Sequence, residues 1–253
     1  MNTNKIKISI VSYTNTLPFR WGLKNSQLIE EIDLQEDIPS ICAQKLLFNQ
    51  VDIALIPVAV IPKLNESYVV SNYCIGADGK VDSVKLYSDV PLTEIKQIIL
   101  DYQSRTSVAL TRVLAKEKWD IRPHYVDALP GFEENISETS AGVVIGDRTF
   151  QLNGKFNYEI DLSEEWKELT GLPFVFAAWV ANKKVDTDFV SKFDAALKLG
   201  VDNISEAVKE LNQKQILSNE DANNYLQKSI SFSLDESKRQ ALNLFLDKLK
   251  VLK

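Results

Sequence analysis

The sequence has few of the residues that bind metals or form disulfide frameworks. It contains one histidine, one methionine and two cysteines among 253 residues. Cys42 and Cys74 are too few for a disulfide scaffold, and their spacing does not match a zinc motif. We therefore expect both to be buried free thiols, in a cytoplasmic protein without a metal site.

Long apolar runs and an excess of basic residues are also missing. No segment approaches the roughly 18 apolar residues that a membrane helix needs, and the N-terminal residues lack a secretory pattern. Lys and Arg number 29 against 35 Asp and Glu, which gives a net charge of −6. This balance argues against nucleic acid or an anionic membrane as a partner. An anionic ligand would have to be attracted by local donors.

The usual signatures of nucleotide binding and nucleophilic catalysis do not occur. The sequence has neither a glycine-rich phosphate loop nor a dinucleotide fingerprint. Its single histidine, His124, lies in a predicted strand, and no serine or cysteine pairs visibly with it. An enzyme with this sequence would work without a metal or a nucleotide, so we expect no cofactor.

What is present is the pattern of an α/β protein with a substantial core. Hydrophobic residues make up 45% of the chain and charged residues 25%, the ordinary balance of a folded protein. Apolar periodicity predicts strands at 5–13, 51–61, 68–86, 95–100, 123–126, 142–145 and 172–180, and helices from 39, at 107–118 and through 186–253. The nearly continuous apolar run at 51–61 is typical of a strand covered on both faces, as in a parallel sheet.

These elements divide into two blocks that are not separated by a flexible linker. Residues 1–88 and 180–253 are predicted to form one lobe, and residues 89–179 a second, inserted α/β lobe. The chain would cross between the lobes near 87–91 and 174–181. Two such crossings predict a hinge and a central cleft.

The last helix is predicted by an amphipathic pattern. Leu242, Phe245, Leu249 and Leu252 recur at spacings of three and four residues and would form one apolar stripe. Ser233 and Glu236 have the spacing of a capping box, which predicts where this helix begins.

A first candidate site segment, 11–18, follows the first predicted strand. Ligands in open α/β sheets bind at the carboxyl ends of strands, where Asn15 could donate one hydrogen bond and accept another. The simpler alternative is that Asn15 and Thr16 only shape a turn before Pro18.

A second candidate segment, 100–107, runs from a strand end into a helix start. Backbone N–H groups there, with the hydroxyls of Ser104, Thr106 and Ser107, could bind a carboxylate or a phosphate. Arg105 could add a charge-assisted hydrogen bond. The alternative is a simple helix cap beside an exposed arginine, although three hydroxyls exceed what a cap requires.

Two further polar residues could lie at the cleft. Ser83 is predicted on one strand face with Val81 and Lys85, near the expected hinge. Asp147 follows a buried strand at 142–145. Either residue could line the cleft, or it could be an ordinary strand or cap residue.

Several of these segments carry a resemblance to a known family over nearly the whole chain. They are 12–18 (SYTNTLP), 51–58 (VDIALIPV), 78–88 (DGKVDSVKLYS), 100–107 (LDYQSRTS), 145–147 (IGD) and 170–179 (TGLPFVFAAW). In this order and spacing they resemble the chorismate dehydratases of the futalosine route to menaquinone. The resemblance implies a two-lobed type II periplasmic-binding-protein-like fold.

The resemblance also implies a reaction, a partner and a set of roles. The reaction is loss of water from chorismate to give 3-[(1-carboxyvinyl)oxy]benzoate. We expect the protein to be a monomer or a weak homodimer. Asn15 and Ser83 would be catalytic, with Asn15 at the leaving hydroxyl or the developing enolate and Ser83 at a carboxylate. Residues implied to bind substrate are Tyr13, Thr16, Pro57, Ser104, Arg105, Thr106, Ser107 and Asp147.

Two alternatives stay open from the sequence. One is 1,4-dihydroxy-6-naphthoate synthase, a later enzyme of the same pathway and fold, which is thought to use a histidine base. The other is a small-carboxylate-binding protein that shares the fold and performs no chemistry.

Overall fold

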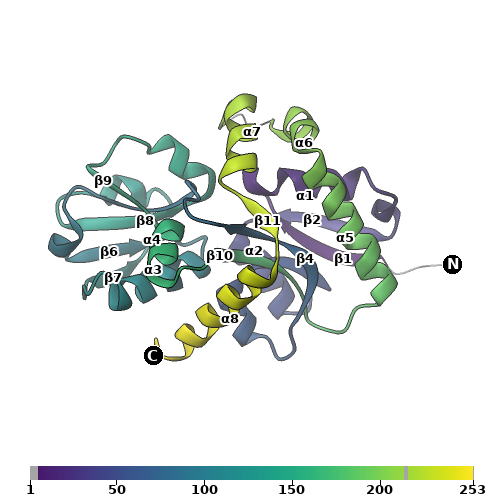
Figure 1. The fold of residues 1–253 in the computed structure, drawn as a ribbon, viewed down its shortest axis with the longest axis horizontal. Coiled ribbons are helices and arrows are strands. Elements are labelled where there is room, and N and C mark those ends of the chain that lie inside the picture. Colours follow the sequence, from purple (N-terminus) through teal and green to yellow (C-terminus); the bar gives the residue numbers. More distant parts are fainter. Residues whose placement is uncertain (1–4, 214–215, 253) are drawn as a thin grey trace.

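The chain folds into two lobes that lie side by side, each with its own β-sheet (Figure 1). This is a computed structural model that describes residues 5–213 and 216–252. No helix within these ranges is long and apolar enough to cross a membrane. The two-lobed α/β architecture expected from the sequence is confirmed.

The sheet of the first lobe has six strands in the order β11-β4-β10-β3-β1-β2. Its strands are β1 (Ile6–Val11), β2 (Ile32–Asp37), β3 (Ile53–Pro57), β4 (Tyr68–Ala77), β10 (Phe174–Ala181) and β11 (Ser231–Ser233). β1 pairs in parallel with β2 and β3, whereas β10 runs antiparallel to β3 and β4. The apolar segment 51–61 therefore contains a central strand, β3, whose five residues are all buried.

The sheet of the second lobe has five strands in the order β7-β6-β8-β5-β9. Its strands are β5 (Val84–Ser88), β6 (Gln97–Leu100), β7 (His124–Asp127), β8 (Ser140–Ile145) and β9 (Tyr158–Asp161). β6 is parallel to β7 and β8, and β5 is antiparallel to β8 and β9. Both sheets are therefore mixed.

Helices cover both sheets (Figure 1). The first lobe carries α1 (Leu17–Lys24), α2 (Pro39–Leu47), α5 (Thr187–Asp202), α6 (Ile204–Leu211), α7 (Asn219–Lys228) and α8 (Glu236–Lys250). The second carries α3 (Thr106–Glu117) and α4 (Leu162–Thr170). Short 3₁₀ turns are η1 (Thr14–Thr16), η2 (Gln27–Glu30), η3 (Val58–Lys63), η4 (Leu92–Glu94), η5 (Phe132–Asn135) and η6 (Gly146–Gln151). Cys42 and Cys74 are buried free thiols, as expected.

The structure differs from the sequence prediction in several local features. Pro18 lies in the first turn of α1 rather than in a loop. Proline is tolerated there because a backbone N–H in the first turn has no intrahelical acceptor. The C-terminal segment contains the short strand β11 as well as helices. The cap of α8 is Asp235, which accepts a hydrogen bond from the Lys238 N–H at 2.9 Å, so the capping box predicted with Ser233 is wrong.

The two sheets divide the chain earlier than the expected boundaries at 88 and 180. β5 belongs to the second sheet, and β10 belongs to the first. The chain therefore crosses between lobes at 78–83, after β4, and at 171–173, before β10. Because β4 and β10 are antiparallel neighbours, the two crossings lie side by side.

Helices α1 and α5 approach so closely that their backbones are in contact. A Cβ atom on Gly200 would lie 1.7 Å from the Pro18 carbonyl oxygen, and one on Gly22 would lie 2.1 Å from the Ala196 carbonyl oxygen. Only glycine fits at such an approach. The contact fixes the start of α1, and with it the preceding turn η1, against the C-terminal helices.

The first crossing is held by a buried carboxylate. Asp161 caps α4 by accepting from the N–H groups of Ser163 and Glu164 at 3.0 and 3.2 Å. Its other oxygen accepts from the N–H groups of Val81 and Asp82 at 2.9 and 2.7 Å. One side chain thus stabilises both a helix start and the segment that precedes β5.

Replacing Asp161 with alanine is expected to cost about 3 kcal/mol of unfolding free energy, because it removes a cap and leaves two further N–H groups unpaired. The matched control is Asp186→Ala, which removes the exposed cap of α5. We expect that control to cost only about 1 kcal/mol. Urea unfolding followed by circular dichroism measures both losses, and equal losses would show that Asp161 does no more than cap α4.

Candidate functional site

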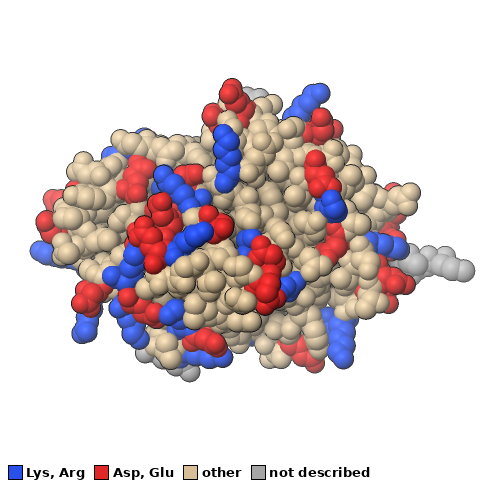
Figure 2. All heavy atoms as spheres, viewed as in Figure 1, with Lys and Arg blue, Asp and Glu red and all other residues tan. Residues whose placement is uncertain are grey.

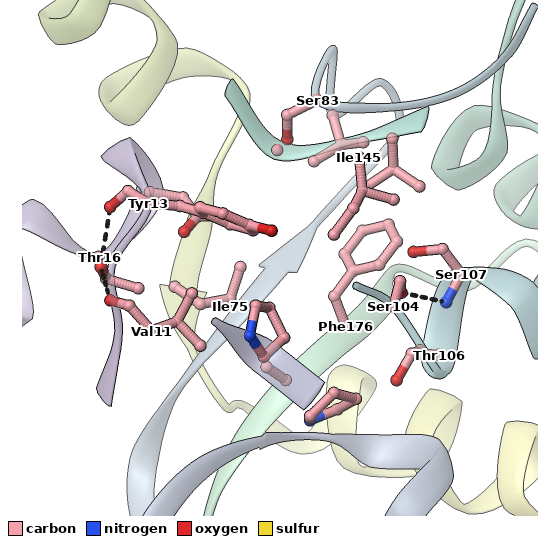
Figure 3. A pocket seen from close by; sticks show the side chains of 17 residues that line it. Val11, Tyr13, Thr16, Ile75, Ser83, Ser104, Thr106, Ser107, Ile145 and Phe176 are labelled. Atoms are coloured by element: carbon pink, nitrogen blue, oxygen red, sulfur yellow. Dashed lines mark hydrogen bonds between the residues drawn. The ribbon is translucent and has the colours of Figure 1, made fainter. Parts of the chain in front are cut away.

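A cavity between the two lobes is lined by most of the predicted site residues (Figure 3). Those that line it are Tyr13, Asn15, Thr16, Pro57, Ser83, Ser104, Thr106 and Ser107. The rest of the lining is Val11, Pro39, Ile75, Val81, Val84, Ile145, Gly146, Phe176 and Ala177. The site is an apolar pocket with a few converging polar groups, the usual form of a small-molecule site.

Two predicted residues do not line this cavity. Arg105 is exposed and borders a separate surface depression together with Lys63 and Tyr102. Asp147 accepts from the Thr14 N–H at 3.2 Å and so connects η6 of the second lobe to η1 of the first. Neither position places its charge on the cavity wall.

Three hydroxyl groups enter the cavity from the start of α3, on the side opposite Tyr13 (Figure 3). Ser104 Oγ accepts from the Ser107 N–H at 3.0 Å, so it satisfies one backbone donor of the first turn. Thr106 Oγ1 accepts from the Ala59 N–H of the first lobe at 3.2 Å. The first turn of α3 contains no acidic residue, so the positive end of its dipole is free to attract an anion.

Ser83 comes from the first crossing and not from within a strand. The preceding residue, Asp82, has a left-handed backbone with φ of 63°, which is uncommon outside glycine. The Asp161 carboxylate fixes the Asp82 N–H, and the Ser83 carbonyl accepts from the Gly146 N–H at 2.8 Å. This backbone geometry turns the Ser83 hydroxyl into the cavity.

Asn15 lies in η1, between β1 and α1. Thr16 fixes this turn by donating its hydroxyl to the carbonyl groups of Val11 and Tyr13. The Oδ1 atom of Asn15 is buried and has no hydrogen-bond partner within the described chain. A buried acceptor without a partner is costly, so this oxygen is suited to accept a hydrogen bond from a ligand.

Tyr13 lines the cavity and contacts the opposite lobe. Its hydroxyl donates to Gln103 Oε1, and its ring packs against Gly146. Gly146 has φ of 67°, and a Cβ atom there would lie 2.8 Å from the Tyr13 ring, so both backbone and space require glycine. Burial and the nearby Asp101 raise the pKa of Tyr13, which therefore stays a neutral donor.

The loop that carries Gln103 is held by Asp101, which sequence reasoning did not single out. Its side chain accepts from the N–H groups of Gln103 and Ile145 at 2.8 and 3.0 Å and pairs with Arg148. Burial raises the pKa of Asp101, against the lowering effect of Arg148 and the two N–H donors. Arg148 also pairs with Glu133, so its charge is already neutralised.

The described side chains that line the cavity are therefore uncharged. None of the described lining residues is a lysine, arginine, aspartate, glutamate or histidine. Acidic and basic side chains are instead mixed across the visible outer face (Figure 2). His124 is exposed on β7 at the edge of the second sheet and does not border the cavity.

Sequence reasoning also missed Tyr225, on α7. It is almost fully buried, and its hydroxyl donates to Ser83 Oγ at 2.7 Å. In the sequence it is one of the buried residues of an amphipathic helix, beside Ala222 and Leu226. Nothing in that pattern distinguishes it from ordinary core.

Comparison with known proteins shows the family of the chain. A family model described as menaquinone biosynthesis matches residues 6–250. The chain belongs to this menaquinone-biosynthesis family. It is 26% identical over 195 residues to a chorismate dehydratase of Thermus thermophilus, with 70% of each chain covered. It is 25% identical over 249 residues to one of Campylobacter jejuni, with 96% of each covered.

Solved structures show that this family member has the periplasmic-binding-protein fold. A Candida albicans protein described as having the generic periplasmic-binding-protein fold matches with a TM-score of 0.71 and 14% identity, over 98% of this chain and 90% of that one. A protein of Archaeoglobus fulgidus matches with a TM-score of 0.80 and 14% identity, over 99% and 98%. The periplasmic aliphatic sulphonate-binding protein of Escherichia coli matches with a TM-score of 0.60 and 14% identity, over 98% and 89%. At these identities the likeness concerns the fold alone.

Proposed function

We propose that the protein is a chorismate dehydratase, a carbon–oxygen lyase that removes water from chorismate to give 3-[(1-carboxyvinyl)oxy]benzoate. The observation that carries the proposal is the convergence of Asn15, Ser83 and the start of α3 on one cavity between the lobes. Two similar proteins are named chorismate dehydratases, and the family is one of menaquinone biosynthesis.

The chemistry suits a cavity of neutral donors. Chorismate loses a proton from the ring carbon that bears the enolpyruvyl ether, and the neighbouring hydroxyl leaves. The C–H and C–O bonds break, and the electron pair of the C–H bond enters the ring. The C–O electron pair leaves with the hydroxyl oxygen, which takes up one proton, so that one water is released. Because the product ring is aromatic, the protein has to supply mainly orientation and stabilisation of negative charge on the ring carboxylate.

Each polar group of the cavity has a proposed role. The N-terminus of α3 with Ser104, Thr106 and Ser107 binds one substrate carboxylate, and Ser83 donates to a carboxylate from the other side of the cavity. Asn15 binds the leaving hydroxyl. Tyr13 and Thr16 close and shape the wall, and Pro57 contributes apolar surface.

The proton acceptor is proposed to be the enolpyruvyl carboxylate of the substrate itself. The described lining residues contain no carboxylate, imidazole or amine to take the proton. The raised pKa of Tyr13 makes its phenolate unfavourable as a base. The same geometry weighs against 1,4-dihydroxy-6-naphthoate synthase activity, because the exposed His124 cannot act in this cavity.

The proposal is tested by incubating purified protein with chorismate and following the products by mass spectrometry. We expect a product lighter than chorismate by one water, with an aromatic absorption spectrum and a rate proportional to protein concentration. Chorismate without protein, and with heat-denatured protein, controls for spontaneous decomposition. Unchanged chorismate that still raises the melting temperature would indicate a binding protein without this activity.

A further inference from the structure

Tyr225 connects the C-terminal part of the chain to two groups of the cavity. It is 6% exposed, and its hydroxyl donates to Ser83 Oγ at 2.7 Å. Its ring packs edge-on against Phe150 of the second lobe, with ring centroids 5.0 Å apart. The residue does not itself border the cavity. It therefore contacts the site only indirectly, through the side chain of Ser83.

A second contact holds α7 to the same crossing. Ser229, the C-terminal cap residue of α7, donates its hydroxyl to Asp82 Oδ2 at 2.8 Å. Asp82 is the residue with the left-handed backbone immediately before Ser83. The helix thus fixes both the backbone that presents Ser83 and the hydroxyl of Ser83 itself.

The direction of the hydrogen bonds determines what Ser83 can offer. A serine hydroxyl has one hydrogen to donate and oxygen lone pairs that accept. Because Ser83 Oγ accepts from Tyr225, its own hydrogen is left to be donated elsewhere. Among the described residues no acceptor binds that hydrogen, and the side chain borders the cavity. Ser83 is thereby oriented as a donor toward a ligand.

The same phenol also orients Asn15. Burial raises the pKa of Tyr225, and its side-chain hydrogen bonds with Ser83 and Asn15 act against this rise. Because the Tyr225 hydroxyl donates its hydrogen to Ser83, its oxygen is left to accept from Asn15. Only the amide nitrogen of Asn15 can donate such a bond. The amide oxygen Oδ1, which has no partner in the described chain, is then left to accept from a ligand.

We propose that Tyr225 is a positioning residue that turns the Asn15 amide oxygen and the Ser83 hydroxyl hydrogen toward the substrate. This inference rests on the proposed function, in which Ser83 donates to a carboxylate and Asn15 accepts from the leaving hydroxyl. Without the phenol, the Asn15 amide could rotate by half a turn and the Ser83 hydrogen could point away. Both groups would remain in the cavity but in the wrong direction.

The test is Tyr225→Phe, which removes the hydroxyl and keeps the ring against Phe150. We expect kcat for chorismate to fall about 10- to 100-fold, because misorientation affects the reacting geometry more than binding. We expect KM to rise by no more than about threefold, since the carboxylate site at α3 is untouched. In a Ser83→Ala background the same change is expected to have a clearly smaller effect on kcat, because one of its two targets is gone.

The matched control is Tyr87→Phe. Tyr87 is also buried, and its hydroxyl donates to the Thr149 carbonyl at 3.1 Å, outside the cavity lining. Both variants are expected to lower the melting temperature by similar amounts, but only Tyr225→Phe should lower kcat. Wild-type kcat in Tyr225→Phe, or the full effect retained in the Ser83→Ala background, would overturn the positioning role. An inactive wild-type protein would overturn the proposed function and this role together.

Discussion

Replacing Asn15 with aspartate is expected to reduce chorismate turnover about 1000-fold or more. The substitution puts a carboxylate where a buried amide faces the cavity, next to a substrate that carries two negative charges. Two like charges about 4 Å apart repel by about 4 kcal/mol at an effective dielectric constant of about 20, which corresponds to three factors of ten. The variant also loses the amide N–H that can donate to Tyr225.

The control for this experiment is Asn25→Asp. Asn25 is exposed at the end of α1, so the variant has the same composition and net charge with the new carboxylate in solvent. Its turnover should match that of the wild type. Asn15→Ala separates charge from hydrogen bonding, and we expect it to lose about 100-fold, the typical cost of one missing catalytic hydrogen bond. Wild-type rates in Asn15→Asp would remove Asn15 from the mechanism.

The largest expected loss of stability comes from Trp166→Ala. Trp166 lies on α4 of the second lobe and is fully buried against Phe174 of β10 and Phe245 of α8, with ring centroids 5.2 and 5.9 Å apart. Its indole N–H donates to the Pro173 carbonyl at the second crossing, at 3.0 Å. Truncation of a buried tryptophan to alanine costs about 3–5 kcal/mol, so the melting temperature should fall by about 10 °C or more.

Trp21→Ala is the matched control for Trp166→Ala. Trp21 is only half-buried on α1, and its indole N–H donates to Glu210 at 2.9 Å on the outside of the first lobe. We expect it to cost about 1–2 kcal/mol because less apolar surface is exposed. Thermal unfolding followed by circular dichroism measures both. If the two variants melted together, the aromatic contact between the lobes would contribute little to stability.

The sequence predicted the fold where local pattern and tertiary structure agree. The apolar run at β3 and the helical spacing of α2 and α3 reflect burial that each segment shows by itself. β2 was not predicted because it is an edge strand with only one fully buried residue. The cap of α8 was misassigned because Ser233 and Asp235 are both good cap residues, and only the backbone decides between them.

The candidate site was predictable where polar residues follow strand ends, and not where distant segments meet. Ser104, Thr106 and Ser107 could be identified because three hydroxyls cluster at one helix start. Gln103 contacts Tyr13 from 90 residues away, and Tyr225 contacts Ser83 from 142 residues away. Their roles depend on how the two lobes pack, which no local pattern in the sequence encodes.

The neutral lining of the cavity has a consequence for product release. Substrate and product of the proposed reaction carry the same two carboxylates, so the donors at α3 and Ser83 bind both. In this proposal the product has lost the hydroxyl assigned to Asn15 Oδ1, and this oxygen would again be buried without a partner. A site that hydrogen-bonds a hydroxyl disfavours an analogue that lacks it. If the proposed roles hold, we therefore expect the product to bind more weakly than chorismate, so that the dehydration itself promotes product release.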